Sequence, residues 1–188
     1  MIAEETMTMS ITKDDASQAL GEIDAADGRV REMRAYARAA PFLMIWGLVW
    51  MGCDLANQFA PQFALAWPIG IAIGSVASFV AGFRLPRTGA ADWRYFAVWW
   101  LVIGFIVALF FVIPVTSGRE IHSVFGLVFG FIYVGMGLWT GWRLPALGVA
   151  LAALTLIGFY EVTTWYGLYM GLVSGGALFL GGLWLRRV

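Results

Sequence analysis

Apolar residues dominate the chain after residue 40, in long stretches that contain no charged side chain. These stretches are 55–83, 95–118, 121–142, 144–160 and 162–185. A helix needs about 20 apolar residues to cross the hydrocarbon core of a bilayer, and Pro61 and Pro68 divide the longest stretch. The pattern therefore predicts six transmembrane helices, at 42–58, 66–83, 94–114, 121–141, 145–161 and 165–185.

The segment before these helices, residues 12–40, has the periodicity of an amphipathic helix. Thr12, with Asp15 three residues later, is typical of a capping box at a helix N-terminus. Apolar residues then recur at every third or fourth position; they are Leu20, Ile23, Ala26, Val30, Met33 and Ala37. We therefore expect two parts, an arm over residues 1–40 and a six-helix transmembrane domain over residues 41–188.

The composition supports a membrane location. The chain is 61% hydrophobic and 13% charged, and its mean hydropathy is +0.78, whereas about a quarter of the residues in soluble domains are charged. Residues 1–40 hold five basic and eight acidic side chains, so the rest of the chain carries few charges. The fold predicted is all-α: a polytopic membrane helix bundle preceded by an N-terminal amphipathic helix in the cytoplasm.

The positions of the basic residues predict the orientation of the bundle. Cytoplasmic loops carry an excess of Lys and Arg, and eleven of the twelve basic residues fall on one side of the predicted helices, with Arg119 on the other. Both termini are therefore expected in the cytoplasm of a bacterium, with the bundle in the inner membrane. Nine arginines are expected to contact anionic lipid headgroups: Arg29, Arg31, Arg34, Arg38, Arg84, Arg87, Arg143, Arg186 and Arg187.

A five-residue motif, which we call the repeated word, occurs twice, as GFRLP at 82–86 and as GWRLP at 141–145. The segment GLWLRR at 182–187 is similar. Each is expected to close an even-numbered helix on the cytoplasmic side, where the arginine meets headgroups and, in the two full copies, the proline begins the next segment. The repetition suggests three related two-helix hairpins. The alternative is that Arg and Trp mark any cytoplasmic interface.

Glycines in the even-numbered helices recur at intervals of about one helical turn. Small residues let helix backbones approach where no hydrophobic effect drives association, so the even-numbered helices are expected to form the packed centre. The glycines assigned to helix packing are Gly70, Gly74, Gly126, Gly130, Gly137, Gly141, Gly167, Gly171 and Gly175. A solute path or a dimer contact along these seams is the alternative.

The arm is acidic in its first half and basic in its second half. Arginines next to a membrane are attracted to anionic lipid by about 1 kcal/mol each, so membrane lipid is the first expected partner. The alternatives are a homo-oligomer or a cytoplasmic protein that docks on the arm. Nucleic acid is not expected, because four arginines in an acidic arm make no extended basic face.

Asp54 is the one carboxylate well inside a predicted span, and it falls in the outer half of the membrane. A charged residue at a helix centre costs roughly 2.5 to 3.5 kcal/mol on insertion scales, so it needs a partner, a proton or water. The residues expected to form an outer polar mouth with it are Asn57, Arg119, Glu120, His122 and Glu161. A purely structural pair of Asp54 with Arg119 or Asn57 would satisfy the site as well.

The residue types needed for catalysis or metal binding do not occur in a complete set. Cys53 and His122 are the single cysteine and the single histidine, too few for a usual zinc site or for a haem held by two histidines. Ser174, in the sequence LVSGG, lacks the preceding glycine of the GxSG motif of rhomboid proteases. No HExxH motif of metalloproteases occurs. We therefore expect no cofactor and no enzymatic activity.

The arm followed by YARAAPFLMIWGLVWMG, and the ending GALFLGGLWLRR, resemble a set of small bacterial inner-membrane proteins that have no assigned function. The helix count and glycine content are also similar to HdeD-type acid-resistance membrane proteins, from which the long acidic arm departs. Neither resemblance carries over a functional residue. The leading hypothesis is a non-enzymatic interaction or stress-related membrane protein. The alternative is a small-solute or ion transporter or channel that uses the polar mouth around Asp54.

Overall fold

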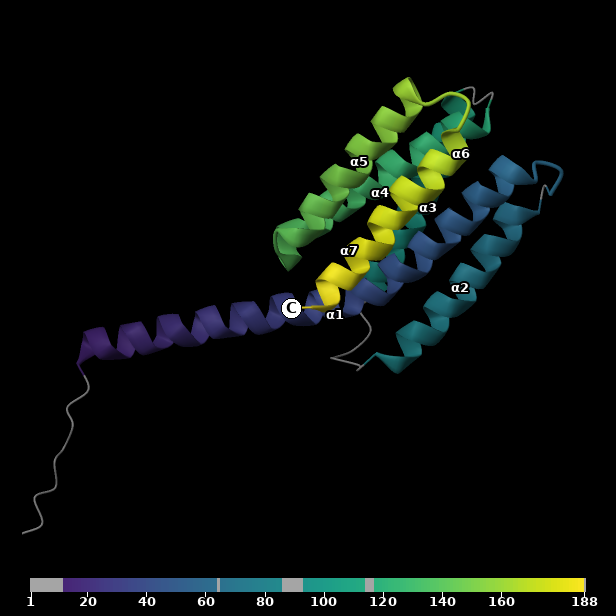
Figure 1. The fold of residues 1–188 in the computed structure, drawn as a ribbon. Helices are drawn as coiled ribbons and strands as arrows, with labels where there is room; N and C mark the ends of the chain where they lie inside the picture. Colours follow the sequence, from purple (N-terminus) through teal and green to yellow (C-terminus); the bar gives the residue numbers. More distant parts are fainter. Residues whose placement is uncertain (1–11, 64, 86–92, 114–116, 188) are drawn as a thin grey trace, which may run out of the picture.

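The computed structural model describes residues 12–63, 65–85, 93–113 and 117–187. Over these ranges the regular structure is entirely helical, as predicted, and no strand is present. The helices are α1 (Lys13–Phe59), α2 (Ala66–Arg84), α3 (Trp93–Val112), α4 (Gly118–Thr140), α5 (Arg143–Glu161), α6 (Tyr166–Tyr169), the π-helical segment η1 (Met170–Gly175) and α7 (Gly176–Arg186). Figure 1 shows a helix bundle from which the first part of α1 projects.

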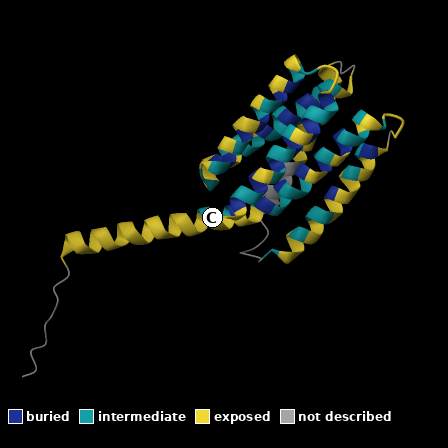
Figure 2. Ribbon diagram, in the orientation of Figure 1, coloured by how far each residue is buried: buried dark blue, intermediate teal, exposed yellow. Residues whose placement is uncertain are grey.

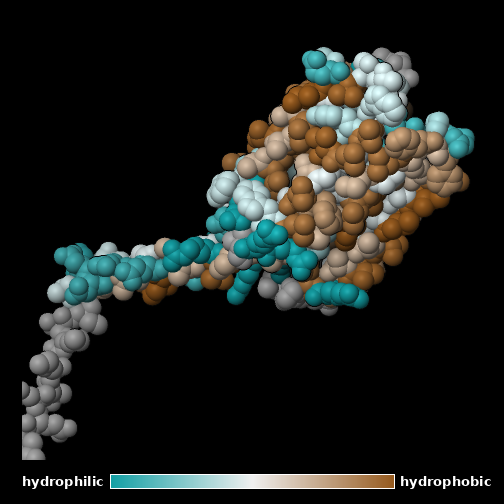
Figure 3. All heavy atoms as spheres, viewed as in Figure 1, coloured by the Kyte–Doolittle hydropathy of each residue, from teal (hydrophilic) through white to brown (hydrophobic). Residues whose placement is uncertain are grey.

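Five of the described helices are long and apolar enough to cross a membrane. They are α1, α2, α4, α5 and the C-terminal helix, which we define as the continuous run of α6, η1 and α7. In α3 the described apolar part, Trp100–Val112, is shorter. Apolar side chains cover the visible face of the bundle, and polar ones gather on the arm and at the bundle ends (Figure 3). The chain therefore has the features of a multi-pass membrane protein.

The predicted arm helix and the first predicted span form one helix rather than two. α1 contains 47 residues, with Pro41 inside it, and Figure 1 shows the helix changing direction where it enters the bundle. Proline has no backbone N–H, so Pro41 cannot make the usual helical hydrogen bond to the carbonyl of Ala37, while the bonds on either side can persist. The proline therefore bends the helix without ending it.

The N-terminus of α1 is fixed by the predicted capping box, which is complete. The Asp15 amide donates to the Thr12 hydroxyl at 3.2 Å, and the Thr12 amide donates to the Asp15 carboxylate at 3.1 Å. The Thr12 hydroxyl also donates to this carboxylate, at 2.6 Å, and the two bonds from Thr12 hold the pKa of Asp15 below its ordinary value. The cap is therefore fully formed at neutral pH and weakens as the pH falls through that lowered pKa.

Two helix pairs come into backbone contact at glycines. α1 packs along the C-terminal helix, and α4 packs along α5. A Cβ atom added to Gly175 would lie 2.9 Å from the backbone oxygen of Gly47, and one added to Gly130 would lie 2.9 Å from that of Gly148. The nine glycines assigned to packing from the sequence all have another part of the chain where a Cβ would project. These contacts exist because glycine leaves the helix surface open.

α2 lies at the periphery of the bundle, against α1. Its buried residues are Ala66 and Gly74, and most of its large apolar side chains are exposed. The expectation that the even-numbered helices form the packed centre is therefore wrong for α2. Its glycine face contacts α1 at Val49 and Cys53.

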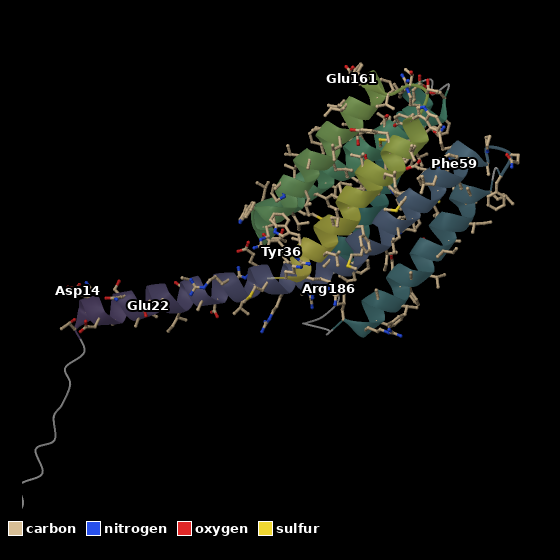
Figure 4. The ribbon with its side chains drawn as sticks, in the orientation of Figure 1. Asp14, Glu22, Tyr36, Phe59, Glu161 and Arg186 are labelled. Atoms are coloured by element: carbon tan, nitrogen blue, oxygen red, sulfur yellow. The ribbon has the colours of Figure 1, made fainter. Side chains whose placement is uncertain are left out.

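Side chains distinguish the two ends of the bundle. Tyr36 and Arg186 lie at the end from which the arm projects, which we call the arm end (Figure 4). Phe59 and Glu161 lie at the opposite end, which we call the far end (Figure 4). Because α1 ends at Phe59 and α2 ends at Arg84, the first helical hairpin returns to the arm end.

The two copies of the repeated word adopt different structures. Gly82 lies within α2, whereas Gly141 lies between α4 and α5 with φ of +110° and ψ of 170°. A Cβ at Gly141 would also meet Glu32 and Tyr36 at the base of the arm, while one at Gly82 would meet only the edge of Phe42 at 4.0 Å. The first copy therefore ends a helix at Arg84, and the second forms a turn with Arg143 as the first residue of α5.

This difference predicts that the two glycines tolerate alanine unequally. Gly141→Ala should lower the free energy of unfolding by about 1–3 kcal/mol, because alanine disfavours this backbone conformation and clashes with the base of the arm. Gly82→Ala, in the same sequence word, should be neutral or stabilising by up to about 1 kcal/mol, because it lies in a helix. Thermal unfolding of the purified protein in detergent measures both; equal midpoints for the two variants would contradict the prediction.

Candidate functional site

A buried aspartate–histidine pair joins α1 to α4. His122 Nδ1 lies 3.1 Å from Asp54 Oδ1, the distance of a hydrogen bond from the imidazole N–H to the carboxylate. Asp54 is 4% exposed and His122 is 7% exposed. Asp54 lies five residues before the end of α1, and His122 lies four residues after the start of α4, so the pair is between one and one and a half helical turns from the far end.

The pair leaves two buried polar atoms without a partner among the described residues. These atoms are Asp54 Oδ2 and His122 Nε2. Each unpaired buried group costs about 1–3 kcal/mol, more when it is charged. The site can lower that cost by taking up or releasing a proton, or by accepting a small polar ligand. The residues beside the pair include Cys53, the chain neighbour of Asp54, and Ser123, the chain neighbour of His122. The unpartnered atoms suit the binding of a proton or of a small polar ligand.

Aromatic rings enclose His122 on three sides. The ring of Trp50 on α1 lies 4.9 Å from the imidazole, that of Trp67 on α2 lies 5.2 Å away, and that of Tyr166 on α6 lies 6.2 Å away. All three contacts are edge-to-face, the arrangement that aromatic rings favour. Both side chains of the pair are buried, and burial away from water strengthens the electrostatic interaction between them.

Tyr166 closes the site toward the far end. Its hydroxyl lies 2.8 Å from Ser123 Oγ and donates to the backbone oxygen of Arg119 at 3.3 Å. The guanidinium of Arg119 lies over the ring of Phe159, with Cζ 4.8 Å from the ring centre. One layer of hydrogen bonds and a cation–π contact therefore separates the pair from the far end.

The C-terminal helix packs directly on the backbone of α1 at Asp54. A Cβ at Gly167 would lie 2.9 Å from the Asp54 backbone oxygen, and one at Gly171 would lie 3.2 Å from Asp54 Cβ. Gln58, one turn after Asp54, accepts from the Gly167 amide at 3.1 Å and donates to the Thr164 carbonyl at 3.3 Å. Gly171 belongs to η1, and π-helical segments occur frequently at functional sites.

The predicted polar mouth is divided in the structure. Asp54 and His122 come together, but Asn57 and Glu161 are exposed. Glu120 accepts from the Ser117 amide at 3.2 Å and so caps α4. The structural partner of Asp54 is therefore His122, not Arg119 or Asn57 as weighed from the sequence.

Several residues of the site did not stand out in the sequence. Trp50 precedes Asp54 by one helical turn, a spacing that places both on one face of α1, and this was the available signal. Trp67 is near a helix end, where aromatic residues are common at membrane interfaces. Ser123 is next to His122 but had no distinguishing feature, because its role depends on Tyr166 from another helix.

The arginines expected to face lipid lie along the arm and at the arm end. In the arm they are exposed; they are Arg29, Arg31, Arg34 and Arg38. Arg84, Arg186 and Arg187 are exposed at helix ends, and Arg87 lies outside the described residues. Arg143 differs, because its guanidinium lies 4.9 Å from the ring centre of Trp184.

Tyr36 fixes the base of the arm to the bundle. Its side chain is fully buried; the hydroxyl donates to Glu32 at 2.6 Å and accepts from the Arg143 amide at 3.2 Å. Burial, and next the bond to Glu32, raise the pKa of Tyr36 above its ordinary value, so the hydroxyl keeps its proton. The arm is therefore free up to about Glu32 and held from Tyr36 onward.

Comparison of the chain with known protein families, curated proteins and solved structures gives no match.

The geometry predicts strong energetic coupling between Asp54 and His122. Asp54→Ala and His122→Ala should each lower the free energy of unfolding by about 3 kcal/mol, because each leaves a buried partner unpaired. The double variant should cost less than the sum by about 1 kcal/mol or more. Unfolding in detergent gives these values, with Asn57→Ala as the exposed control. Additive losses, or losses no larger than that of the control, would show that the pair does not hold α1 to α4.

Proposed function

We propose that this chain is a non-enzymatic protein of the bacterial inner membrane that acts by interaction through its cytoplasmic arm, in a role related to stress. The observation that carries the proposal is the continuity of α1, in which a single helix joins the exposed arm to the buried Asp54. A continuous helix can carry displacement from one site to another, and α1 is continuous through its bend at Pro41. A change in the packing around Asp54 would therefore change the position of the arm.

The exposure of the arm supports an interaction role. Every residue from 13 to 31 is exposed, and Figure 2 shows this along the projecting part of α1. Leu20 and Ile23 are 63% and 57% exposed. An apolar face that stays open along several helical turns is typical of a surface that another molecule covers.

The stress-related part of the proposal rests on the buried pair and on the resemblance to acid-resistance membrane proteins. Asp54 and His122 are both ionisable residue types, and histidine commonly serves as a switch in pH sensors. The pair lies toward the far end, where the proposed orientation places the periplasm. Acidification outside the cell would thus reach the pair before it reached the arm.

Six spans with both termini in the cytoplasm belong to the same proposal. The arm and the C-terminus lie at the same end of the bundle (Figure 1), as an even number of spans requires. The exposed ends of α2 and α7 carry Arg84 and Arg186 at that end, in agreement with the excess of positive charge on cytoplasmic loops. HdeD-type proteins share this helix count, and membership of that group or of the small inner-membrane proteins remains part of the proposal.

Transport through a polar mouth around Asp54 is the weaker candidate. Asp54 and His122 are both buried, and Trp50, Trp67 and Tyr166 contact His122. Two apolar grooves, of about 540 and 450 Å³, are lined by other residues on the bundle surface. An enclosed pair supports a role in positioning α1 better than a role in conduction.

The proposed orientation predicts the activity of reporter fusions. A green fluorescent protein fused after Val188 should fluoresce, because it folds in the cytoplasm, and alkaline phosphatase at the same place should be inactive. The two reporters should behave in the opposite way when the chain is ended after Gln62, between α1 and α2. Phosphatase activity after Val188 would reverse the topology and place the arm in the periplasm.

The interaction role predicts that the apolar face of the arm touches another protein in the cell. A photo-crosslinking amino acid at Ile23 should yield a protein adduct, whereas the same group at Ala25, about 200° around the helix, should yield several-fold less. Gel mobility of the tagged chain after irradiation measures both. If Ile23 formed adducts with lipid and none with protein, the interaction role would be contradicted, and the arm would be a helix that lies on the membrane surface.

A further inference from the structure

We propose that the arm binds a second copy of this chain, with the two arms paired antiparallel. This inference rests on the proposed function, because it names the partner of the same surface. It is drawn from the arrangement of apolar and charged positions along the exposed part of α1.

The arm carries an uninterrupted heptad stripe. Apolar residues alternate at spacings of three and four, which places them on one helical seam: Ala16, Ala19, Ile23, Ala26, Val30, Met33 and Ala37. All seven are exposed. A seam of this period is the surface by which two helices pack side by side.

The charges on the arm complement one another when it is reversed. Residues 13–27 carry five acidic side chains and one basic one, and residues 28–40 carry four arginines and one glutamate. Antiparallel pairing places the acidic half of each arm beside the basic half of the other. Anionic lipid would attract only the basic half and repel the acidic half. A second copy therefore matches the whole arm, and a membrane surface matches half of it.

The residues that flank the seam select the antiparallel orientation. In a parallel pair, Glu22 would face Asp27 of the second copy, and Arg29 would face Arg34 of the second copy, so both contacts would repel. In an antiparallel pair, Glu22 faces Arg29 of the second copy, and the symmetry makes this contact twice. Lys13 of each copy approaches Arg34 of the other copy at the two ends of the pair. Both side chains are exposed there, so solvent and salt screen their repulsion.

Side-chain size selects the register. When Ile23 lies opposite Ala26 of the second copy, Val30 lies opposite Ala19 and Met33 lies opposite Ala16. Every larger side chain in these layers then meets an alanine, so the helices can approach closely and evenly. A shift by one heptad would bring Arg29 against Arg29 and Asp27 against Asp27 across the two-fold axis, which disfavours it.

The fold permits this pairing without contact between the bundles. The two-fold axis lies between residues 24 and 25, so the two copies of Pro41 are separated by 33 residues of rise, about 50 Å. α1 changes direction at its entry to the bundle, so the arm points away from the bundle (Figure 1). The proposed pairing places the two arms in the space between two bundles in one membrane. Confinement to the same membrane raises the effective concentration of the arms and favours pairing of short helices.

Disulfide trapping in membranes tests orientation and register together. In a Cys53→Ser background, one tagged chain carries Ala16→Cys and a differently tagged chain carries Met33→Cys. Copper phenanthroline should join the two chains, because these positions share a layer. Either variant expressed alone should give about tenfold less product, since its two copies would be roughly 25 Å apart, beyond the reach of a disulfide.

Two controls keep the result specific. In the first control, one chain carries Gln18→Cys and the other carries Arg31→Cys. These positions lie opposite each other along the paired arms but on their outer faces, so this pair should give about tenfold less disulfide product than the seam pair. Glu22→Arg should reduce trapping of the seam pair by about two- to tenfold, and adding Arg29→Glu should restore it, because the contact is then re-formed with its charges exchanged.

The outcomes separate this proposal from the proposed function. Strong trapping of Ala16→Cys alone and of Met33→Cys alone would overturn it in favour of parallel pairing. No trapping, together with a protein adduct at Ile23, would overturn it while leaving an interaction role with a different partner. No trapping and only lipid adducts at Ile23 would remove both proposals.

Discussion

Backbone contact between α1 and the C-terminal helix is the constraint on which the rest of the structure depends. Lipid provides no hydrophobic drive for helix association, so the contact relies on small residues that let backbones meet. It extends from Gly182, opposite the Ala40 carbonyl, to Gly167, opposite the Asp54 carbonyl. Because α1 is held over this whole length, one interface fixes both the point at which the arm leaves the bundle and the depth at which Asp54 is buried.

The helices could be predicted closely from the sequence, because charges, prolines and glycines mark their ends. The start of α4 was predicted at 121 and lies at Gly118, since Ser117 and Glu120 form a capping box that draws polar residues into the first turn. The unbroken course of α1 could not be predicted. Whether a proline ends a helix depends on what holds its neighbours, and Ala40 and Leu43 are buried in the core on either side of Pro41.

The candidate site was predictable in part. Asp54 stands out because an isolated carboxylate in an apolar helix is costly. Its partner could not be deduced, because the meeting of Asp54 with His122 depends on how α1 and α4 are rotated about their axes. That rotation is set by tertiary packing, including the contact of Trp50 with Phe129, whose ring centres lie 6.3 Å apart. The periodicity of a single helix contains no information about such a contact.

The π-helical segment explains how the glycine seam stays aligned with α1. Residues four apart drift by about 40° per step around an α-helix, because a turn holds 3.6 residues. Gly167, Gly171 and Gly175 would therefore rotate progressively away from α1 in a regular helix. A π-helical turn holds more residues, so η1, over Met170–Gly175, reverses the drift. All three glycines can then meet α1, at Asp54, Met51 and Gly47, and the irregular backbone is what brings the C-terminal helix against the buried aspartate.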